Sequence, residues 1–168
     1  MLHMELWDIY DIDKNKTGKI MIRNDWTMAD GDYYLSVLGV IRTPDGRFLI
    51  TRRAMDKAWA PGWWEVPGGG VKSGETSFEA VCREVLEETG VDVSKAKGGF
   101  MFSYHREQPG QNYIVDIYRF DMDISEKDVR LQSSEDIEFK FATASEICRI
   151  ADKGQFLHYL SIRKVFEE

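Results

Sequence analysis

A single strong helix signal near the middle of the chain fixes how the rest of the sequence can be arranged. The segment 77–89 follows Thr76, which forms a capping box with Glu79, and the segment stops at Gly90. Short strand-like segments lie on both sides of this helix, and two further amphipathic helical segments close the chain. This order predicts an α/β (α+β) fold with a mixed sheet and helices packed on its faces.

The domain organisation follows from the absence of any repeat, low-complexity tract or Pro/Ser-rich linker in the 168 residues. We expect one domain over 1–168, with an N-terminal β extension (1–32), a core (33–147) and a C-terminal helix (148–168). We expect strands over 5–10, 19–23, 33–42, 47–51, 63–66, 100–105, 113–122 and 137–141. We expect the two later helices over 143–152 and 155–166.

Charge and hydropathy narrow the range of partners. The chain has 22 basic and 29 acidic residues, a net charge of -7, and such a surface repels nucleic-acid backbones and anionic membranes. Apolar runs are only a few residues long, and the first residues lack the basic start and apolar stretch of a signal peptide. We therefore expect a cytoplasmic protein that acts on a small molecule, without a nucleic-acid polymer or membrane partner. The sequence leaves a homodimer open.

Three carboxylates of the 77–89 helix share one face. Glu84, Glu87 and Glu88 are spaced i, i+3 and i+4, whereas Val81 and Val85 fall on a different, apolar face. Clustered like charges destabilise an isolated helix, and a divalent cation would reverse that cost because Mg²⁺ and Mn²⁺ prefer oxygen ligands. The alternative interpretation is a solvated acidic face.

A triple glycine, 68–70, precedes this helix by a short loop. Glycine allows the backbone to approach a ligand closely and to adopt positive φ, and the N-terminus of a helix favours phosphate. The alternative is a tight turn with no ligand.

Together these residues reproduce a known pattern. Gly69, five residues, Glu75, seven residues and then the run 83–91 (REVLEETGV) resemble the Nudix box, with seven identities and two aliphatic positions matched. At ordinary residue frequencies a chance match at one register has odds on the order of one in a hundred million. The resemblance implies a Nudix-type α/β/α sandwich with a catalytic loop-helix-loop, and an enzyme that hydrolyses a diphosphate linked to another moiety.

The resemblance also assigns roles within the box. It implies that Glu84, Glu87 and Glu88 bind Mg²⁺ or Mn²⁺, and that a backbone carbonyl of Gly68 or Gly69 adds a ligand. Glu75 and Arg83 would then pair and orient these ligands from behind, as outer partners of metal sites do.

A base that deprotonates the attacking water is expected outside the box. In many relatives it lies on a later loop or strand, which makes Glu135 and Glu138 the candidates here. Both are equally well explained as solvated loop charges.

The segments that flank the box resemble the branch related to isopentenyl diphosphate isomerase. In that branch an Arg and a Lys contact the diphosphate, which implies this role for Arg53 and Lys57, although a solvated loop would have the same composition. The catalytic cysteine of such isomerases should fall near 67–68, where this chain has Pro and Gly. Hydrolysis is therefore the better interpretation.

Aromatic residues offer a surface for a nucleobase. Trp59, Trp63, Tyr104 and Tyr113 could stack on a base, although core or loop packing is the commoner role of such residues. We therefore expect a metal-dependent hydrolase that cleaves a nucleoside diphosphate linked to another moiety, by attack of water at phosphorus. The alternatives are an isomerase of isoprenoid diphosphates and a catalytically silent nucleotide sensor.

Overall fold

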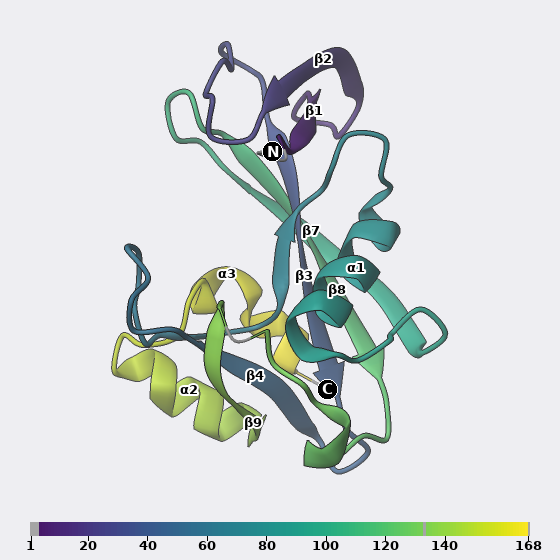
Figure 1. The fold of residues 1–168 in the computed structure, drawn as a ribbon, viewed down its shortest axis with the longest axis vertical. Coiled ribbons are helices and arrows are strands. Elements are labelled where there is room, and N and C mark those ends of the chain that lie inside the picture. The colour runs from purple at the N-terminus through teal and green to yellow at the C-terminus, as the bar shows by residue number, and fades with distance from the viewer. Residues whose placement is uncertain (1–3, 133, 168) are drawn as a thin grey trace.

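The structure, a computed structural model, describes residues 4–132 and 134–167 (Figure 1). Its helical elements are α1 (Ser77–Thr89), η1 (Glu126–Asp128), α2 (Ala144–Asp152), α3 (Tyr159–Ile162) and η2 (Arg163–Phe166). Its strands are β1 (Leu6–Tyr10), β2 (Lys16–Ile22), β3 (Tyr34–Arg42), β4 (Arg47–Arg53), β5 (Trp64–Glu65), β6 (Gly68–Gly70), β7 (Lys97–Arg106), β8 (Tyr113–Asp121) and β9 (Asp136–Thr143).

Strand β3 is the centre of a mixed sheet. It pairs in parallel with β8 from Tyr34↔Tyr113 to Arg42↔Asp121, and β7 continues that side in the antiparallel sense. Its other edge pairs with β6 and, at one position, with β4, which in turn carries β5 and β9. The predicted mixed sheet is therefore confirmed.

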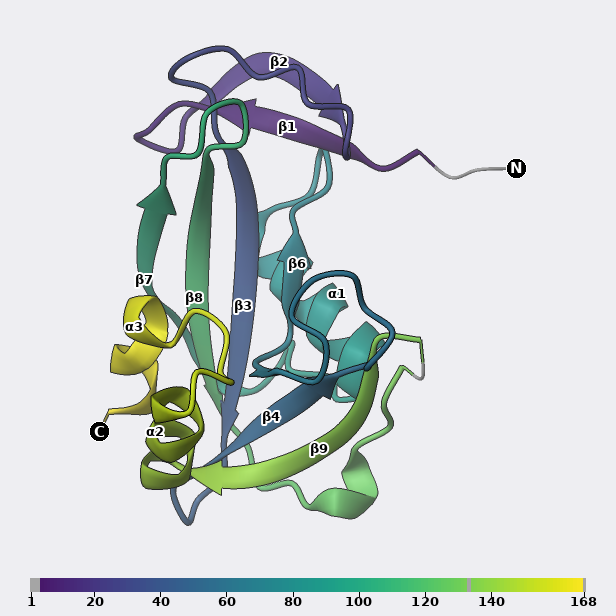
Figure 2. The ribbon, with the colours of Figure 1, turned by 90° about the vertical axis from the view of Figure 1, so that its left-hand side faces the viewer.

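Helices cover both faces of this sheet, so the molecule has three layers (Figure 2). On β3, Val37 and Ile41 belong to the buried cluster under α1, whereas Val40 belongs to the cluster that contains Ile147 of α2 and Ile162 of α3. This alternation is what a strand buried on both faces requires.

Close packing of α1 on β3 depends on a glycine. A Cβ at Gly39 would lie 2.6 Å from Val85 and 2.8 Å from Val81, so no larger residue fits beneath the helix. The helix begins and ends where the sequence predicts, with a capping box between Thr76 and Glu79 and with Gly90 in the left-handed region at φ 74°. The helix that carries the carboxylates is thus fixed at both ends and along its buried face.

The N-terminal β extension forms a hairpin at one end of the molecule (Figure 1). Its Trp7 stacks on Tyr34 with ring centroids 4.6 Å apart and covers Gly70, where a Cβ would lie 2.7 Å from the indole. Its Asp8 accepts hydrogen bonds from the Ser73 hydroxyl (2.8 Å) and the Gly74 N–H (2.9 Å). The hairpin therefore fastens the connection between β6 and α1.

Two predicted elements differ in the structure. The segment 68–70 is a short strand paired with β3, not a loop, because its extended backbone completes the free edge of that strand. The predicted helix 155–166 is broken: Trp64 exchanges backbone hydrogen bonds with Gln155 and Leu157, and His158 adopts φ 61°. Only the short α3 and η2 remain helical, which also corrects the expected C-terminal helix.

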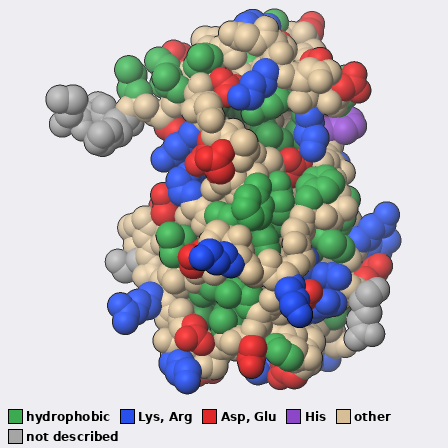
Figure 3. Space-filling view, turned by 90° about the vertical axis from the view of Figure 1, so that its right-hand side faces the viewer, with side chains coloured by type: hydrophobic (Ala, Val, Ile, Leu, Met, Phe, Trp, Pro, Cys, Tyr) green, Lys and Arg blue, Asp and Glu red, His purple; other side chains and the backbone are tan. Residues whose placement is uncertain are grey.

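The face that carries α1 exposes a group of hydrophobic side chains among charged ones (Figure 3). Phe78 and Leu86 of α1 and Phe100 of β7 are each about half exposed, and both phenyl rings pack against Tyr118. No helix in the described residues combines the length and the apolar character that a membrane span needs.

Candidate active site

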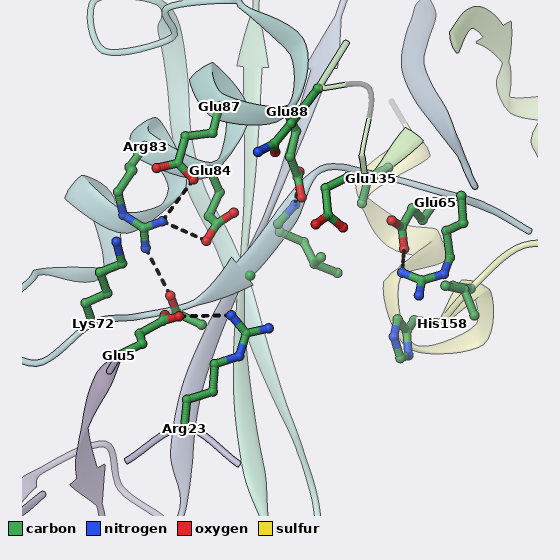
Figure 4. Close-up of a pocket in the computed structure, with 18 residues that line it drawn as sticks. Glu5, Arg23, Glu65, Lys72, Arg83, Glu84, Glu87, Glu88, Glu135 and His158 are labelled. Atoms are coloured by element: carbon green, nitrogen blue, oxygen red, sulfur yellow. Dashed lines mark hydrogen bonds and ion pairs between the residues drawn. The ribbon is translucent and has the colours of Figure 1, made fainter. Parts of the chain in front are cut away.

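A polar cavity of about 330 Å³ lies between α1, β5, β6, the ends of the β1–β2 hairpin and the loop before β9 (Figure 4). Glu84, Glu87 and Glu88 line it, as do Gly68 and Gly69. The other charged or polar residues that line it are Glu5, Arg23, Arg53, Glu65, Lys72, Arg83, Gln132, Glu135 and His158.

Arg83 is the hub of the hydrogen bonds on one side of this cavity. Its guanidinium forms a two-pronged ion pair with Glu75 at 2.7 and 3.0 Å, and it also donates to the Gly70 carbonyl at 3.1 Å. Its remaining N–H group reaches Glu84 at 2.8 Å and Glu87 at 3.4 Å. These bonds lower the pKa of Glu75 and raise that of Arg83, so the pair stays ionised and holds Glu84 in place.

Glu88 lies one turn after Glu84 on the same face of α1 and is half-buried. Its carboxylate accepts a hydrogen bond from the Gly68 N–H at 2.9 Å. Burial, followed by the nearby charges of Glu84, Glu65 and Asp136, raises the pKa of Glu88 well above its usual value. Burial also raises the pKa of Glu84. The other acids that line the cavity each pair with an Arg or a Lys, whereas no ion pair to Glu88 is present among the described residues.

No side chain fits at Gly68 or Gly69 without a clash, and the group that it would clash with differs between the two positions. A Cβ at Gly69 would overlap the carboxylate of Glu84, whose Cδ would be 2.6 Å away. A Cβ at Gly68 would overlap the backbone carbonyl of Val37 in the neighbouring strand. Both glycines have ordinary negative or extended φ, so their role is close approach and not a turn.

This difference gives a prediction with a matched pair of variants. Gly69→Ala displaces only the flexible Glu84 carboxylate, so we expect hydrolysis to fall about 100-fold with an unfolding free energy changed by less than about 1 kcal/mol. Gly68→Ala clashes with backbone, so we expect a loss of about 1–3 kcal/mol in stability. Urea unfolding and turnover of both variants check this. Equal destabilisation by the two substitutions would contradict it.

The two predicted bases are in different places. Glu135 lines the cavity and pairs with Lys57 at 2.6 Å. Lys57, which was predicted to contact the diphosphate, is outside the lining and is connected with the cavity through this ion pair. Glu138 is outside the cavity lining, on an exposed part of β9, where it pairs with Arg52 at 3.4 Å. Of these two candidates the structure brings only Glu135 to the carboxylates of α1.

Arg53 and Trp59 lie together at the other end of the cavity. The Arg53 Nε donates to the Trp59 carbonyl at 3.1 Å, and its guanidinium lies 5.3 Å from the centre of the indole ring. Arg53 also pairs with Glu65 of β5 at 3.6 Å. Both predicted residues are thus near the site, with Arg53 lining the charged cavity.

Several lining residues were not singled out from the sequence. Glu65 precedes the glycines in a strand and could have been noticed as an acid beside a glycine loop. Arg23 and His158 gave no signal, because the hairpin and the broken C-terminal segment bring them in from distant parts of the chain. Glu5, Lys72 and Gln132 complete this set.

Two acids that are largely shielded from water, Glu65 and Asp136, predict how stability depends on pH. Burial raises the pKa of Glu65 to about 7 and that of Asp136 to about 6. The folded protein then binds more protons than the unfolded chain above about pH 4.5, so its stability falls as the pH rises toward 7. For Glu65 alone the penalty is on the order of 3 kcal/mol above pH 7.

Urea unfolding of the metal-free protein between pH 5 and 8 tests this sign. Glu65→Gln should flatten the decline, whereas Glu138→Gln, which changes an exposed acid on β9, should leave it unchanged. A stability that rises over this interval would contradict the prediction.

A second cavity, of about 490 Å³, adjoins the first. Leu38, Gly68, Gly69 and His158 line both cavities. The predicted Trp59 and Tyr104 line the second one, together with Tyr34 and Tyr113. Sequence-predicted aromatic residues are therefore brought together beside the charged cavity.

Comparison with known proteins agrees with this arrangement. The family model of the NUDIX domain matches residues 32–164. An uncharacterized Nudix hydrolase of Listeria monocytogenes is 31% identical over 164 residues, which cover 97% of this chain and 94% of that protein. The crystal structure of DR0079 from Deinococcus radiodurans has a TM-score of 0.77 and 22% identity over 98% of this chain and 100% of that one. A MutT protein of Methanosarcina mazei has a TM-score of 0.63 and 28% identity over 80% of this chain and 91% of that one.

The fold and the box define a hydrolase that acts on diphosphate-containing substrates. The chain belongs to the Nudix hydrolase family. The resemblance of residues 69–91 to the Nudix box is thereby confirmed, as is the Nudix-type fold.

Nudix hydrolases generally need a divalent metal ion, and the donor set of the cavity fits such an ion. Carboxylate and carbonyl oxygens are what a hard divalent cation prefers, and within the described part of the chain no Lys or Arg pairs with Glu88. Within the described residues no three acidic, His or Cys side chains already converge as ligands would. Arg83 donates to Glu84 and Glu87, and the Gly68 N–H donates to Glu88.

Proposed function

We propose that the protein is a metal-dependent pyrophosphohydrolase. Its substrate is a nucleoside diphosphate linked to another moiety, and water attacks phosphorus. The observation that carries the proposal is the set of three α1 carboxylates facing the backbone of β6 in a cavity that also holds Arg23, Arg53 and Lys72. Acids for a metal and cations for phosphate oxygens are the two requirements of diphosphate hydrolysis.

The charged residues of the box and the adjoining glycine backbone have distinct roles in this proposal. Glu84, Glu87 and Glu88 hold Mg²⁺ or Mn²⁺ with a backbone carbonyl of Gly68 or Gly69. When bound, such an ion neutralises phosphate charge and lowers the pKa of bound water. Arg83 and Glu75 position Glu84 and Glu87 from behind.

Residues outside the box bind the substrate and move the proton. Arg53 contacts the diphosphate from the cavity wall, and Lys57 acts beside it through its ion pair with Glu135. Glu135 is the base that accepts the proton of the attacking water, since it lines the cavity and Glu138 does not.

An isomerase is the less supported alternative. Its cysteine would be needed near Pro67, and the two cysteines of the chain, Cys82 and Cys148, lie half-buried on α1 and α2, outside the lining of the cavity. A nucleotide sensor without catalysis remains the second alternative. Measured hydrolysis of a diphosphate substrate would distinguish an enzyme from such a sensor.

The test is a panel of diphosphate compounds with phosphate release coupled to a phosphatase. We expect turnover with Mg²⁺ or Mn²⁺ and its loss on exhaustive chelation. Full activity after chelation would overturn the metal dependence. Binding of nucleotides without any turnover would favour the sensor, and migration of a double bond in isopentenyl diphosphate would favour the isomerase.

A further inference from the structure

Trp7 of the β1–β2 hairpin packs against a glycine whose carbonyl binds Arg83. We propose that Trp7 is a positioning residue: through the Gly70 carbonyl and Arg83 it fixes two of the proposed metal ligands. These ligands are Glu84 and Glu87, to which Arg83 donates hydrogen bonds. Trp7 lies upstream of the residues that match the family model. The inference rests on the proposed function, since it takes the two carboxylates as ligands of a metal ion.

The indole of Trp7 lies directly on the backbone of Gly70. A Cβ at Gly70 would be 2.7 Å from Cζ2, 2.8 Å from Cε2 and 2.9 Å from Nε1 of the indole, and these are the three atoms nearest to it. Only the lack of a side chain at Gly70 lets the ring come so close. Because closely packed atoms resist displacement, the ring opposes movement of β6 toward the hairpin.

Trp7 is itself held in place by neighbours from separate parts of the chain. It is buried, and its ring stacks on Tyr34 of β3 with centroids 4.6 Å apart. Its Nε1 donates to Glu5 at 3.1 Å, and the guanidinium of Arg23 lies 5.7 Å from the centre of its ring. Arg23 also pairs with Glu5 at 2.9 Å. A ring fixed in this way can hold the strand beside it.

The Gly70 carbonyl is one of two groups that anchor Arg83 from behind the ligands. It accepts a hydrogen bond from the guanidinium at 3.1 Å, and Glu75 accepts two more at 2.7 and 3.0 Å. The remaining N–H group of the guanidinium points toward Glu84 and Glu87 (Figure 4). Because a guanidinium is a rigid, planar fork, a shift of its anchor at Gly70 also shifts the N–H group that faces the carboxylates.

The hairpin also holds the residues that lead to Glu75, the second anchor. Asp8 accepts hydrogen bonds from the Ser73 hydroxyl at 2.8 Å and from the Gly74 N–H at 2.9 Å. The carbonyl of the residue before Trp7 accepts a hydrogen bond from the Ser73 N–H at 2.7 Å. Strand β1 therefore contacts both parts of the chain that anchor the guanidinium.

Ordinary packing of the hairpin is the alternative explanation for a buried Trp7. Trp7 forms a small apolar cluster with Ile9 and Met21, and all three side chains are buried. The three atoms nearest to a Cβ at Gly70 all belong to Trp7, and none belongs to Ile9. Ile9→Ala is therefore the matched control, because it loosens the same cluster and leaves the indole on Gly70.

Binding of Mn²⁺ alone, measured by calorimetry without substrate, tests the role of Trp7. Loss of an outer partner that contacts a ligand typically changes metal affinity about 10–100-fold, and Trp7 lies one contact further out. We therefore expect Trp7→Leu to raise the Kd of Mn²⁺ about 3- to 10-fold. Ile9→Ala should lower the Tm of the protein and leave this Kd unchanged.

A second substitution, at Gly70, makes the test specific for the contact. Gly70→Ala alone places a methyl group against the indole, so we expect it to raise the Kd of Mn²⁺ by a similar factor. Trp7→Leu removes the three indole atoms that would clash, and β6 has an extended backbone that alanine also adopts. The Kd of the double variant should therefore return to within about 2-fold of the parent value.

Three results would overturn the role of Trp7. They are an unchanged Kd in Trp7→Leu, an equal rise in Ile9→Ala, and losses that multiply in the double variant. Trp7→Phe, which keeps a ring beside Tyr34 and removes Cζ2, takes the place of Trp7→Leu if that variant does not fold. The same outcomes then decide the role.

A metal-free measurement separates this inference from the proposed function. The Nε–H of Arg83, which donates to Glu75 at 2.7 Å, gives an NMR signal whose exchange with solvent reports how firmly the guanidinium is held. Trp7→Leu should speed this exchange at least about 3-fold, and Ile9→Ala should not. If the parent binds no Mn²⁺, the proposed metal site is lost and the exchange rates still decide whether Trp7 positions Arg83. If the parent binds Mn²⁺ and turns over diphosphates while Trp7→Leu matches it in both measurements, the hydrolase stands and the role of Trp7 is lost.

Discussion

Glu88→Gln is expected to lower kcat/KM for diphosphate hydrolysis by about 1000-fold. The substitution keeps the shape of the side chain and an oxygen that can accept the Gly68 N–H, but it removes the charge that a metal ion requires. Loss of one charged ligand withdraws several kcal/mol of stabilisation from the transition state, and 4 kcal/mol corresponds to about 1000-fold in rate.

Substitutions of Glu75 and Arg83, which position the proposed metal ligands, should lower kcat/KM less than Glu88→Gln does. Glu75→Gln and Arg83→Ala remove orientation only, because Arg83 contacts the carboxylates and Glu75 contacts Arg83. We expect losses of about 10–100-fold for these variants. Steady-state kinetics of the three proteins under saturating Mg²⁺ give the order. Losses in Glu75→Gln that match or exceed those of Glu88→Gln would refute these roles.

Melting experiments should separate the charge of Glu88 from its place in the fold. At a metal concentration 100 times Kd, a ligand of the folded state adds about 2.7 kcal/mol, which raises the Tm of a domain of this size by about 5–11 °C. We expect that rise for the parent and little of it for Glu88→Gln. In EDTA, Glu88→Gln should melt at or above the parent, because a buried charge is gone and its hydrogen bond remains.

Glu84→Gln is the comparison for this experiment. The sequence predicts repulsion among all three carboxylates, but in the structure Arg83 lies within reach of both Glu84 and Glu87. Removal of the Glu84 charge therefore also weakens an ion pair, and we expect no gain in EDTA. A melting point of Glu88→Gln well below the parent in EDTA would show a structural role. Equal metal shifts in the parent and Glu88→Gln would exclude Glu88 as a ligand.

Local signals predicted the catalytic helix well. The capping box at Thr76 and the stop at Gly90 are contained in the segment itself, and both are present in the structure. The i, i+3, i+4 spacing of Glu84, Glu87 and Glu88 likewise predicts that these side chains lie on one face of the helix. Such features are readable because each depends on residues only a few positions apart.

Features that depend on distant pairing were missed. The glycines of 68–70 become a strand only because β3 offers them a free edge, and 155–157 leave the helix only because Trp64 bonds to them. Amphipathic spacing in 155–166 is equally consistent with a broken segment packed on a sheet. The β1–β2 hairpin brings Arg23 to the site, and the pairing of 155–157 with Trp64 brings His158, so no local pattern could reveal either residue.

The hairpin of β1 and β2 has a consequence for how this enzyme is delimited. The family match begins at residue 32, yet Glu5 and Arg23 line the charged cavity and Trp7 rests on Gly70. One wall of the charged cavity is therefore formed by residues upstream of the family match. Because Arg23 in that wall is also one of the cations proposed to bind phosphate, we expect substitutions upstream of residue 32 to alter the charge of the cavity as well as its shape.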